Sequence, residues 1–402
     1  MSSSAIILAI LFPLCFYFIK PKNKPKDTRF LFMIYYASII LSIFYDVSKD
    51  IKSYRSIDEY SVGSFLLFGA LILLALYPLM KLRPIVNVNS KLKLSKRNMI
   101  LVKILVYGNF LAVLYFLPSV IEAFGLGAEK VRVDVLQLEK GSILPKSIFT
   151  TLFVTFTAFN PLIIVLFFLN LNNMFKFNKY ILGLASLSYI FNSLAFQARD
   201  GFIYYIFIFL VVQLNCYGKV PSILKRKITK KQSYIWLSSL VFLIVLGYIT
   251  AQRFHKNISD FFNGIIGYVA QQPYTFAENY LIRSEYDNFY GPFFRFPIIW
   301  PLHNEELERT MAYEWNFGTF ITDFYNINGL FTCVLILLFM NFIFRQILKN
   351  KHPLGYIIAY SLIIHFYISG LFYFRLGNML GNTYIIAMIL MSIIVSKRIK
   401  FK

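Results

Sequence analysis

The sequence predicts an all-α polytopic membrane protein with about eleven transmembrane helices and one large extracytoplasmic loop. Composition is the first reason, since 58% of the 402 residues are hydrophobic and the mean hydropathy of +0.61 is far above that of soluble domains. Apolar runs of about 18 to 22 residues, long enough to cross a bilayer as helices, recur along the chain. The third reason is an alternation of charge between successive loops, which also sets the expected orientation.

The apolar runs give eleven expected helices. No basic residue precedes the first run and no small-residue cleavage site follows it, so we expect a retained helix rather than a signal peptide. No fixed-period repeat or flexible linker divides the sequence, and residues 1–402 are expected to form a single integral-membrane domain. In chain order the expected helices cover residues 2–19, 30–47, 61–80, 99–121, 147–170, 180–197, 201–216, 234–252, 321–344, 353–370 and 379–396.

Basic residues distinguish alternate loops sharply. The loops after the first, third, fifth, seventh and ninth expected helices, together with the C-terminal tail, carry most of the lysines and arginines and a single acid, Asp27. Because Lys and Arg accumulate on the cytoplasmic side of membrane proteins, we expect these segments inside, with the N-terminus outside and the C-terminus inside. The net charge of +22 is then a topology signal and does not indicate a nucleic-acid partner.

The expected outer segments differ in length and character. Residues 46–60 mix both charges, as an ordinary solvated loop does, and residues 122–146 are long enough to fold over a site. The longest outer segment, 253–315, is the one long polar interruption of the sequence. Connections of this length are usually either functional or disordered, and its many aromatic residues argue against disorder. We therefore expect a folded functional site in this loop.

Arginines at the expected outer surface are candidates for binding phosphate. A guanidinium stays charged and offers forked donors that match phosphate oxygens. For several of these arginines the alternative is an ion pair with a neighbouring carboxylate, as Arg199 could form with Asp200. The candidates are Arg199 in the tight QARDG turn, Arg253 at the start of the long loop, Arg283 and Arg295 within it, and Arg375 between the last two helices.

Histidine and aromatic side chains add candidates for proton transfer and sugar binding. His303 lies late in the long loop, where it is either an acid–base group titrating near neutral pH or an ordinary surface histidine. His365 lies well inside the tenth expected helix, where ionisable residues are unusual; a hydrogen bond to a neighbouring helix is its alternative. Trp300 and its aromatic neighbours suit an interfacial belt or a flat face for a sugar. Asn160–Pro161 is expected to kink the fifth helix.

Metal and nucleotide motifs are absent from the sequence. It contains no HExxH, Walker loop, DxD or cysteine pair, and its three cysteines fall in or beside apolar runs. We expect neither a metal nor a cofactor.

The chain returns to the membrane through the segment NFGTFITDFYNINGL. This segment resembles the re-entry motif of the bacterial O-antigen polymerase (Wzy) family, which reads N-x-x-T-F, then D-F-G and a further Gly at the start of a helix. Tyr325 stands where the first of these glycines is expected. The spacing of ten residues between Arg253 and Gly264 also resembles an arginine–glycine pattern of these polymerases. The matching motif residues are Asn316, Thr319, Phe320, Asp323, Phe324 and Gly329.

The resemblance implies a GT-C-like, metal-independent glycosyltransferase at the outer face of the bacterial cytoplasmic membrane. Such an enzyme passes a growing chain from its undecaprenyl-diphosphate carrier to a new carrier-linked repeat unit, building O-antigen or capsule. Arg199 and Arg253 are then expected to stabilise the departing diphosphate. A chain-length regulator (Wzz-type co-polymerase) and a flippase are the implied partners. The proton acceptor is expected among His303, Glu278 and Asp323, and substrate binding is expected of Arg283, Arg295, Trp300, Asn316 and Arg375.

Two other activities remain open. O-antigen ligases carry a histidine just before re-entry, where this chain has Asn316, and the difference favours a polymerase. A flippase or transporter of lipid-linked oligosaccharides moves the same substrate but needs no large outer loop. Inverted internal repeats, which would favour a transporter, are not evident in the sequence.

Overall fold

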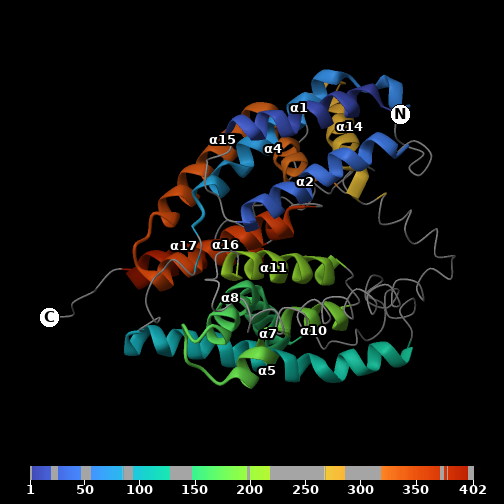
Figure 1. The fold of residues 1–402 in the computed structure, drawn as a ribbon. Helices are drawn as coiled ribbons and strands as arrows, with labels where there is room; N and C mark the ends of the chain where they lie inside the picture. Colours follow the sequence, from blue (N-terminus) through green and yellow to red (C-terminus); the bar gives the residue numbers. More distant parts are fainter. Residues whose placement is uncertain are drawn as a thin grey trace. The chain divides into compact units, whose positions relative to one another are not determined.

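A computed structural model describes most of the apolar part of the chain. Within the described residues the chain is helical and has no β-strand (Figure 1). These residues fall into two compact units. Unit 1 comprises Met1–Arg83, Phe262–Lys351 and His365–Ile393, and unit 2 comprises Pro84–Phe261, His352–Ile364 and Ile394–Lys402. The described residues are 2–19, 26–46, 56–83, 85, 94–126, 147–196, 200–217, 267, 269–285, 318–371, 375–377 and 379–396.

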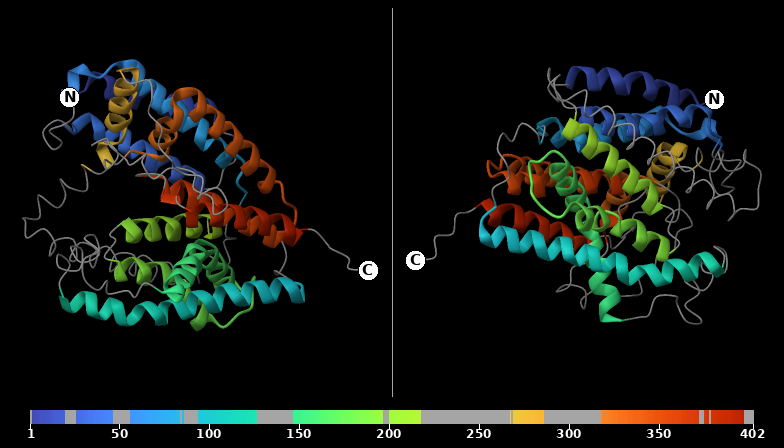
Figure 2. Two further views of the ribbon diagram at one scale, coloured as in Figure 1. Left: turned by 180° about the vertical axis from the view of Figure 1, so that it is seen from behind. Right: turned by 60° about the horizontal axis from the view of Figure 1, so that its bottom comes forward.

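Unit 1 is built from long apolar helices around one short polar helix. Helix α1 packs against α2 and α4, and α14 packs against α2, α4 and α15. The views of Figures 1 and 2 agree on this arrangement. The helices are α1 (Ser3–Ile19), α2 (Lys26–Phe44), α4 (Val62–Leu76) continued by the 3-10 turn η2 (Tyr77–Lys81), α14 (Gln272–Glu285), α15 (Phe320–Leu348), the end of α16 (Pro353–Ser369) and most of α17 (Met379–Ser396).

Phe320 is the centre of the aromatic core of unit 1. Its ring lies edge-on to those of Phe324 and Phe366, with centroids 5.5 Å apart in both pairs. The hydroxyl of Tyr35 donates to the carbonyl of Tyr367 (2.7 Å), and the Tyr367 hydroxyl donates to the carbonyl of Ala75 (2.5 Å). These two bonds satisfy buried polar groups that would otherwise destabilise an apolar interior. The first turn of α15 is thereby fixed against α2, α4 and α16.

Unit 2 is organised along α5 (Lys96–Leu126), which packs against α7, α9 and α10. Helix α5 approaches α7 closely at Gly108, where a Cβ atom would lie 2.3 Å from the Phe156 ring. A core of Ala112, Phe116 and Ala195 continues this contact. The other helices of the unit are α7 (Ile148–Ala158), α8 (Asn160–Leu171), α9 (Lys179–Ala185), α10 (Ser188–Ala195), α11 (Asp200–Tyr217) and the first part of α16.

Two expected spans of unit 2 are broken. The fifth bends by 51° between α7 and α8, which confirms the kink expected at Asn160–Pro161. The sixth, expected to be continuous over 180–197, is interrupted between α9 and α10. Asn160 holds this second break, because its Nδ2 donates to the carbonyls of Ala185 (3.3 Å) and Ser186 (2.8 Å) and to Ser188 Oγ (3.0 Å). Two carbonyls at the second break are therefore satisfied inside the protein, as a membrane interior requires.

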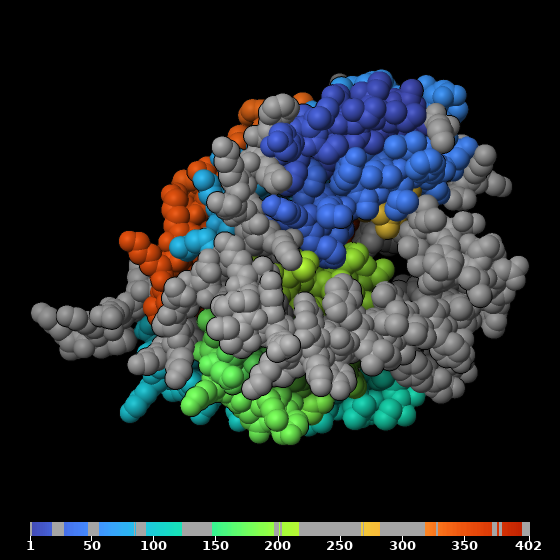
Figure 3. Space-filling view, in the orientation of Figure 1, coloured from blue at the N-terminus to red at the C-terminus, as the bar shows by residue number. Residues whose placement is uncertain are grey.

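Several helices are compatible with a membrane protein. By length and composition alone, three in the described part of the chain qualify as spans: Val62–Lys81, Lys96–Glu122 and Gly329–Leu348. The bent pair α7–α8 is a fourth if it counts as one span, and five further apolar helices are shorter. The surface of α1 and α2 (Figure 3) includes exposed Ile10, Tyr17 and Met33. Large exposed apolar faces of this kind are rare on soluble monomers. The predicted helix at 234–252 lies outside the described residues.

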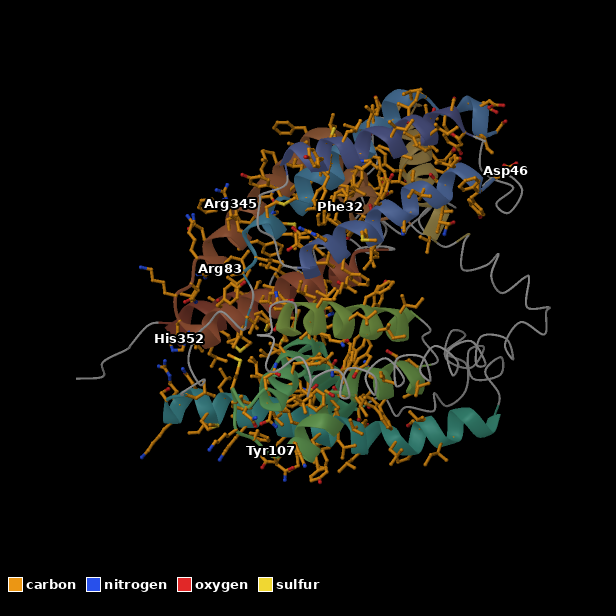
Figure 4. The ribbon with its side chains drawn as sticks, in the orientation of Figure 1. Phe32, Asp46, Arg83, Tyr107, Arg345 and His352 are labelled. Atoms are coloured by element: carbon orange, nitrogen blue, oxygen red, sulfur yellow. The ribbon has the colours of Figure 1, made fainter. Side chains whose placement is uncertain are left out.

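Opposite ends of unit 1 differ in charge. At one end Thr28 Oγ1 donates to the carbonyl of Leu79 (3.4 Å), and Arg83 Nη2 donates to the carbonyl of Leu348 (2.9 Å). Figure 4 shows Arg83 and Arg345 at this end and Asp46 at the other. The start of α2 and the ends of α4 and α15 thus share the end where the sequence places lysines and arginines. This arrangement fits the expected alternation of helices, while the orientation in a membrane remains a prediction.

Candidate functional site

The end of unit 1 opposite the basic residues gathers several chain segments that the sequence separates widely. Ser4 Oγ, at the start of α1, donates to the carbonyl of Tyr60 (3.0 Å). The hydroxyl of Tyr274 in α14 donates to the carbonyl of Ser42 at the end of α2 (2.9 Å). The backbone N–H of Phe320 donates to the carbonyl of Gly370 after α16 (2.9 Å). We call this region, comprising residues 2–4, 42–46, 57–64, 271–281, 318–326 and 370, the α14 end of unit 1.

Helix α14 is polar and yet buried. Pro273 fits its first turn, where a missing N–H costs no helical hydrogen bond. Two side chains of this helix form local hydrogen bonds. Thr275 Oγ1 donates to the carbonyl of Gln271 (3.1 Å), and Asn279 Nδ2 donates to the carbonyl of Thr275 (2.6 Å). Buried polar groups of this density are unusual in an apolar core and call for specific partners. The buried polar residues of this segment are Gln271, Gln272, Thr275, Glu278 and Asn279.

Glu278 is the acid at the centre of this region. Its side chain is 1% exposed, and its Oε2 accepts a hydrogen bond of 2.6 Å from the Tyr60 hydroxyl. Tyr60 also packs against the Tyr274 ring, with centroids 5.4 Å apart. A phenol that donates to a carboxylate fixes the orientation of that carboxylate. The structure therefore holds Glu278 in one defined position at the α14 end.

Tyr274 links α14 to the ends of α1 and α2. Burial raises the pKa of Tyr274 to about 12; a hydrogen bond with Ser2 lowers this pKa, and the charge of Asp46 raises it. Its phenol is therefore neutral over the physiological range, and it acts as a hydrogen-bond donor to Ser42. Its ring also packs against that of Phe65 in α4, with centroids 5.3 Å apart.

Asp323 lies in the first turn of α15, on the motif that resembles a re-entry segment. Thr319 caps this helix, because its side chain accepts a hydrogen bond of 3.2 Å from the Ile321 N–H. Thr319 and Phe324 are fully buried, whereas Asp323 is half-buried. The motif thus fixes the helix start and leaves its one carboxylate, that of Asp323, within reach of solvent. Carboxylates near a helix N-terminus are stabilised in their charged form by the backbone dipoles.

The backbone conformation of Gly329 explains why the motif ends in a glycine. It is the one glycine with a positive φ in the described part of the chain, with φ of 74° inside α15. This left-handed conformation suits glycine, because a side chain would clash with the backbone. The apolar span Gly329–Leu348 begins at this residue. The motif therefore comprises a capped first segment, 320–326, which is buried apart from the half-buried Asp323, and a glycine in the left-handed conformation.

Two further buried acceptors lie in this region. Gln272 Oε1 and Thr322 Oγ1 have no hydrogen-bond partner within the part of the chain that the structure describes. Both side chains are buried, Gln272 at 1% exposure and Thr322 at 3%. An orphaned polar atom costs about 1–3 kcal/mol. Such atoms mark places where a hydroxyl-bearing ligand or a water would gain hydrogen bonds.

The predicted site residues are described to different extents. Asp323 is described fully and lies at the α14 end. Arg283 lies in the last turn of α14 and Arg375 in the 3-10 turn η6 (Arg375–Gly377), which follows Gly370 closely; only their backbones are described. Those that lie outside the described residues are Arg199, Arg253, Arg295, Trp300, His303 and Asn316.

His365, expected to be unusual, packs against another helix of unit 1. Its ring lies edge-on to that of Tyr384 in α17, with centroids 5.1 Å apart, and it is buried. This contact places His365 in the interhelical core. The hydrogen bond to a neighbouring helix, which was its expected structural alternative, stays a prediction.

Sequence reasoning missed Tyr60. It lies at the end of a segment expected to be an ordinary solvated loop, yet it is 4% exposed. The signal was the S-I-D-E stretch from Ser56 to Glu59, which reads as a capping box. In the structure Ser56 precedes the short turn η1 (Ile57–Glu59), and the Glu59 carboxylate accepts a hydrogen bond from the Ser56 N–H (3.2 Å). The turn directs Tyr60 inward.

No family model, curated protein or solved structure matches this chain. The resemblance to O-antigen polymerases therefore rests on the motif residues and the layout of the sequence.

Proposed function

We propose that this protein polymerises undecaprenyl-diphosphate-linked oligosaccharide repeat units into a bacterial surface polysaccharide. The observation that carries the proposal is the re-entry motif at the start of α15. Its described residues take defined roles: Thr319 caps the helix, Phe320 and Phe324 anchor it, Asp323 stays half-buried and Gly329 supplies a left-handed turn. A buried, hydrogen-bonded acid on the adjacent helix α14 supports the same proposal.

The proposed reaction needs a proton acceptor and a stabilised leaving group. The acceptor hydroxyl oxygen attacks the anomeric carbon that joins the growing chain to its carrier. The bond from this carbon to the diphosphate oxygen breaks, and its electrons leave with undecaprenyl diphosphate. The hydroxyl proton passes to a carboxylate, and guanidinium groups bind the released diphosphate. The reaction consumes no nucleotide and is balanced without an oxidant or a metal.

Asp323 is our preferred proton acceptor. A base must come within hydrogen-bond reach of the acceptor hydroxyl, and Asp323 is half-buried, whereas Glu278 is buried behind Tyr60. We assign Glu278 a positioning role, in which it and Tyr60 hold α14 against the start of α4. The buried acceptors Gln272 and Thr322 suit the hydroxyls of a sugar.

The proposed diphosphate and substrate contacts come from residues whose side chains the structure does not describe. Arg199, Arg253 and Arg375 remain the proposed ligands of the diphosphate, and Arg283, Arg295, Trp300 and Asn316 the proposed sugar or carrier contacts. His303 remains a second candidate for proton transfer. The proposed location is the bacterial cytoplasmic membrane, with the reaction on its outer face and with a Wzz-type chain-length regulator and a flippase as partners.

The test compares purified full-length protein with its Asp323→Asn variant. Each receives lipid-linked repeat units, EDTA and no nucleotide, and the products are separated as a glycan ladder. We expect longer lipid-linked chains from the wild type. Loss of a general base slows a reaction by about 10²–10⁴-fold, so we expect the variant to elongate at least about a hundredfold more slowly.

Asp58 supplies the matched control. It lies in η1, within the α14 end, but its side chain is exposed and has no part in the contacts described for Asp323 or Glu278. Asp58→Asn should therefore elongate at the wild-type rate. Equal activity of Asp323→Asn and wild type would remove Asp323 from the mechanism. Transfer of finished polymer to a separate acceptor, without elongation, would instead identify a ligase. Movement of the lipid across vesicle membranes without elongation would identify a flippase.

A further inference from the structure

The basic end of unit 1 combines a cluster of cations with an apolar helix face. The cations come from the start of α2, the end of η2 and the last turns of α15. Hydrogen bonds from Thr28 to Leu79 and from Arg83 to Leu348 and Asn350 (3.1 Å) hold these segments together. We use the name "basic end" for Arg29, Lys81, Arg83, Arg345, Lys349 and Lys351; all but the half-buried Arg345 are exposed.

The positions of two cations are fixed by neighbouring groups. The guanidinium carbon of Arg345 lies 5.4 Å from the centre of the Tyr77 ring, a geometry that orients the cation. Lys349 Nζ lies 3.3 Å from Gln346 Oε1 and donates to it. Asp27 is the only acid in residues 20–29, 77–83 and 345–352. The cluster therefore carries a strong excess of positive charge.

An exposed apolar stripe runs along α15 toward these cations. Leu335 and Leu338 are each 49% exposed, Phe339 is 65% exposed and Phe342 is 61% exposed. The spacing of three and four residues places them on one helix face. The same face continues through exposed Gln346 to exposed Lys349. Apolar side chains over two helical turns would suit the acyl chains of a phospholipid, and the cations that follow them would suit its phosphate.

We propose that the basic end of unit 1 and the adjoining face of α15 bind one anionic phospholipid. The phosphate of the headgroup lies among Arg345, Lys349 and Lys351, and an acyl chain lies along Phe342, Phe339 and Leu335. The excess of positive charge selects an anionic headgroup over a zwitterionic one, since each Lys or Arg near an anionic surface strengthens the attraction several-fold. This binding site is separate from the α14 end and does not depend on the proposed polymerase activity.

The experiment uses purified full-length protein in a neutral detergent. Phosphatidylglycerol, phosphatidylcholine with the same acyl chains, and inorganic phosphate are added separately. The melting temperature and the number of lipids retained in native mass spectrometry are measured. We expect phosphatidylglycerol to raise the melting temperature and to stay bound. Phosphatidylcholine should do so weakly, and inorganic phosphate should have no effect because it lacks acyl chains.

Variants assign the effect to this cluster. Lys349→Gln should weaken phosphatidylglycerol retention roughly fivefold, because each Lys or Arg near an anionic surface contributes about 1 kcal/mol of attraction. The double variant Lys349→Gln with Lys351→Gln should weaken it roughly 25-fold. Lys179→Gln is the control, because Lys179 is an exposed cation of unit 2 that also lies over a tyrosine ring, 4.9 Å from the Tyr180 centroid. Wild-type protein that binds both lipids equally would overturn the proposal. Equal losses in the Lys179 control, or retention unchanged in the double variant, would overturn it as well.

Discussion

Gly329 offers the sharpest test of how the re-entry motif is built. Its φ of 74° is left-handed, a conformation that costs an L-residue with a Cβ about 1–2 kcal/mol. Replacing glycine by alanine also removes freedom from the unfolded chain, which stabilises a protein by about 0.4–1 kcal/mol at a compatible position. The difference between the two effects predicts that Gly329→Ala destabilises the fold by about 0–1.6 kcal/mol.

Gly63 is the matched control for this substitution. It is an exposed glycine in the first turn of α4, and a Cβ there would meet nothing closer than Ser61 Oγ at 3.9 Å. Gly63→Ala should therefore stabilise the protein. The difference between the two alanine variants isolates the left-handed strain, about 1–2 kcal/mol. Gly329→Asn should recover part of the loss, because asparagine tolerates this conformation better than alanine.

The assay is unfolding of the purified variants in mixed micelles with increasing SDS, followed by circular dichroism at helical wavelengths. Midpoints and slopes give the free energy of unfolding for each variant. The reasoning is refuted if Gly329→Ala and Gly63→Ala shift the midpoint in the same direction by the same amount. That result would mean that position 329 accepts a right-handed helical conformation without strain.

Two other predictions concern unit 2 and the topology. Asn160→Leu should destabilise the protein by about 2–4 kcal/mol in the same assay. The substitution removes the donor to Ala185, Ser186 and Ser188 and leaves buried acceptors unsatisfied. A loss of stability below about 0.5 kcal/mol would contradict this role. Reporter fusions after Lys402 and between 283 and 287 should give opposite signals, since the basic residues place the C-terminus inside and the long loop outside. Signals from the same side would rule out that topology.

The helices themselves followed from the sequence because their signal is local. Ten of the eleven apolar runs correspond to described helices or to helix pairs, and hydrophobic length needs no knowledge of neighbours. The break between α9 and α10 was not predictable in this way. It depends on Asn160, which comes from the preceding span and supplies the hydrogen bonds that the interrupted backbone needs.

The candidate site was predictable only in part for a related reason. Asp323 and Gly329 were found through a motif, but the partners of α14 come from distant segments. Helix α14 lacks an apolar run, so hydropathy does not reveal that α2, α4 and α15 bury it. Tyr60 precedes its partner Glu278 by more than two hundred residues. Pairing over such distances is a property of packing and leaves little trace in local sequence.

The burial of α14 argues that this end of unit 1 serves more than stability. Replacing a buried polar group by an apolar one of similar shape is often neutral or stabilising, so a helix selected for stability alone would carry leucine or phenylalanine at these positions. The chain instead places Gln272, Thr275, Glu278 and Asn279 inside an apolar unit. It also keeps Gln272 Oε1 without a partner in the described part of the chain. Polar burial that costs free energy, beside a half-buried carboxylate, supports the proposal that this end of unit 1 binds a hydroxyl-rich substrate.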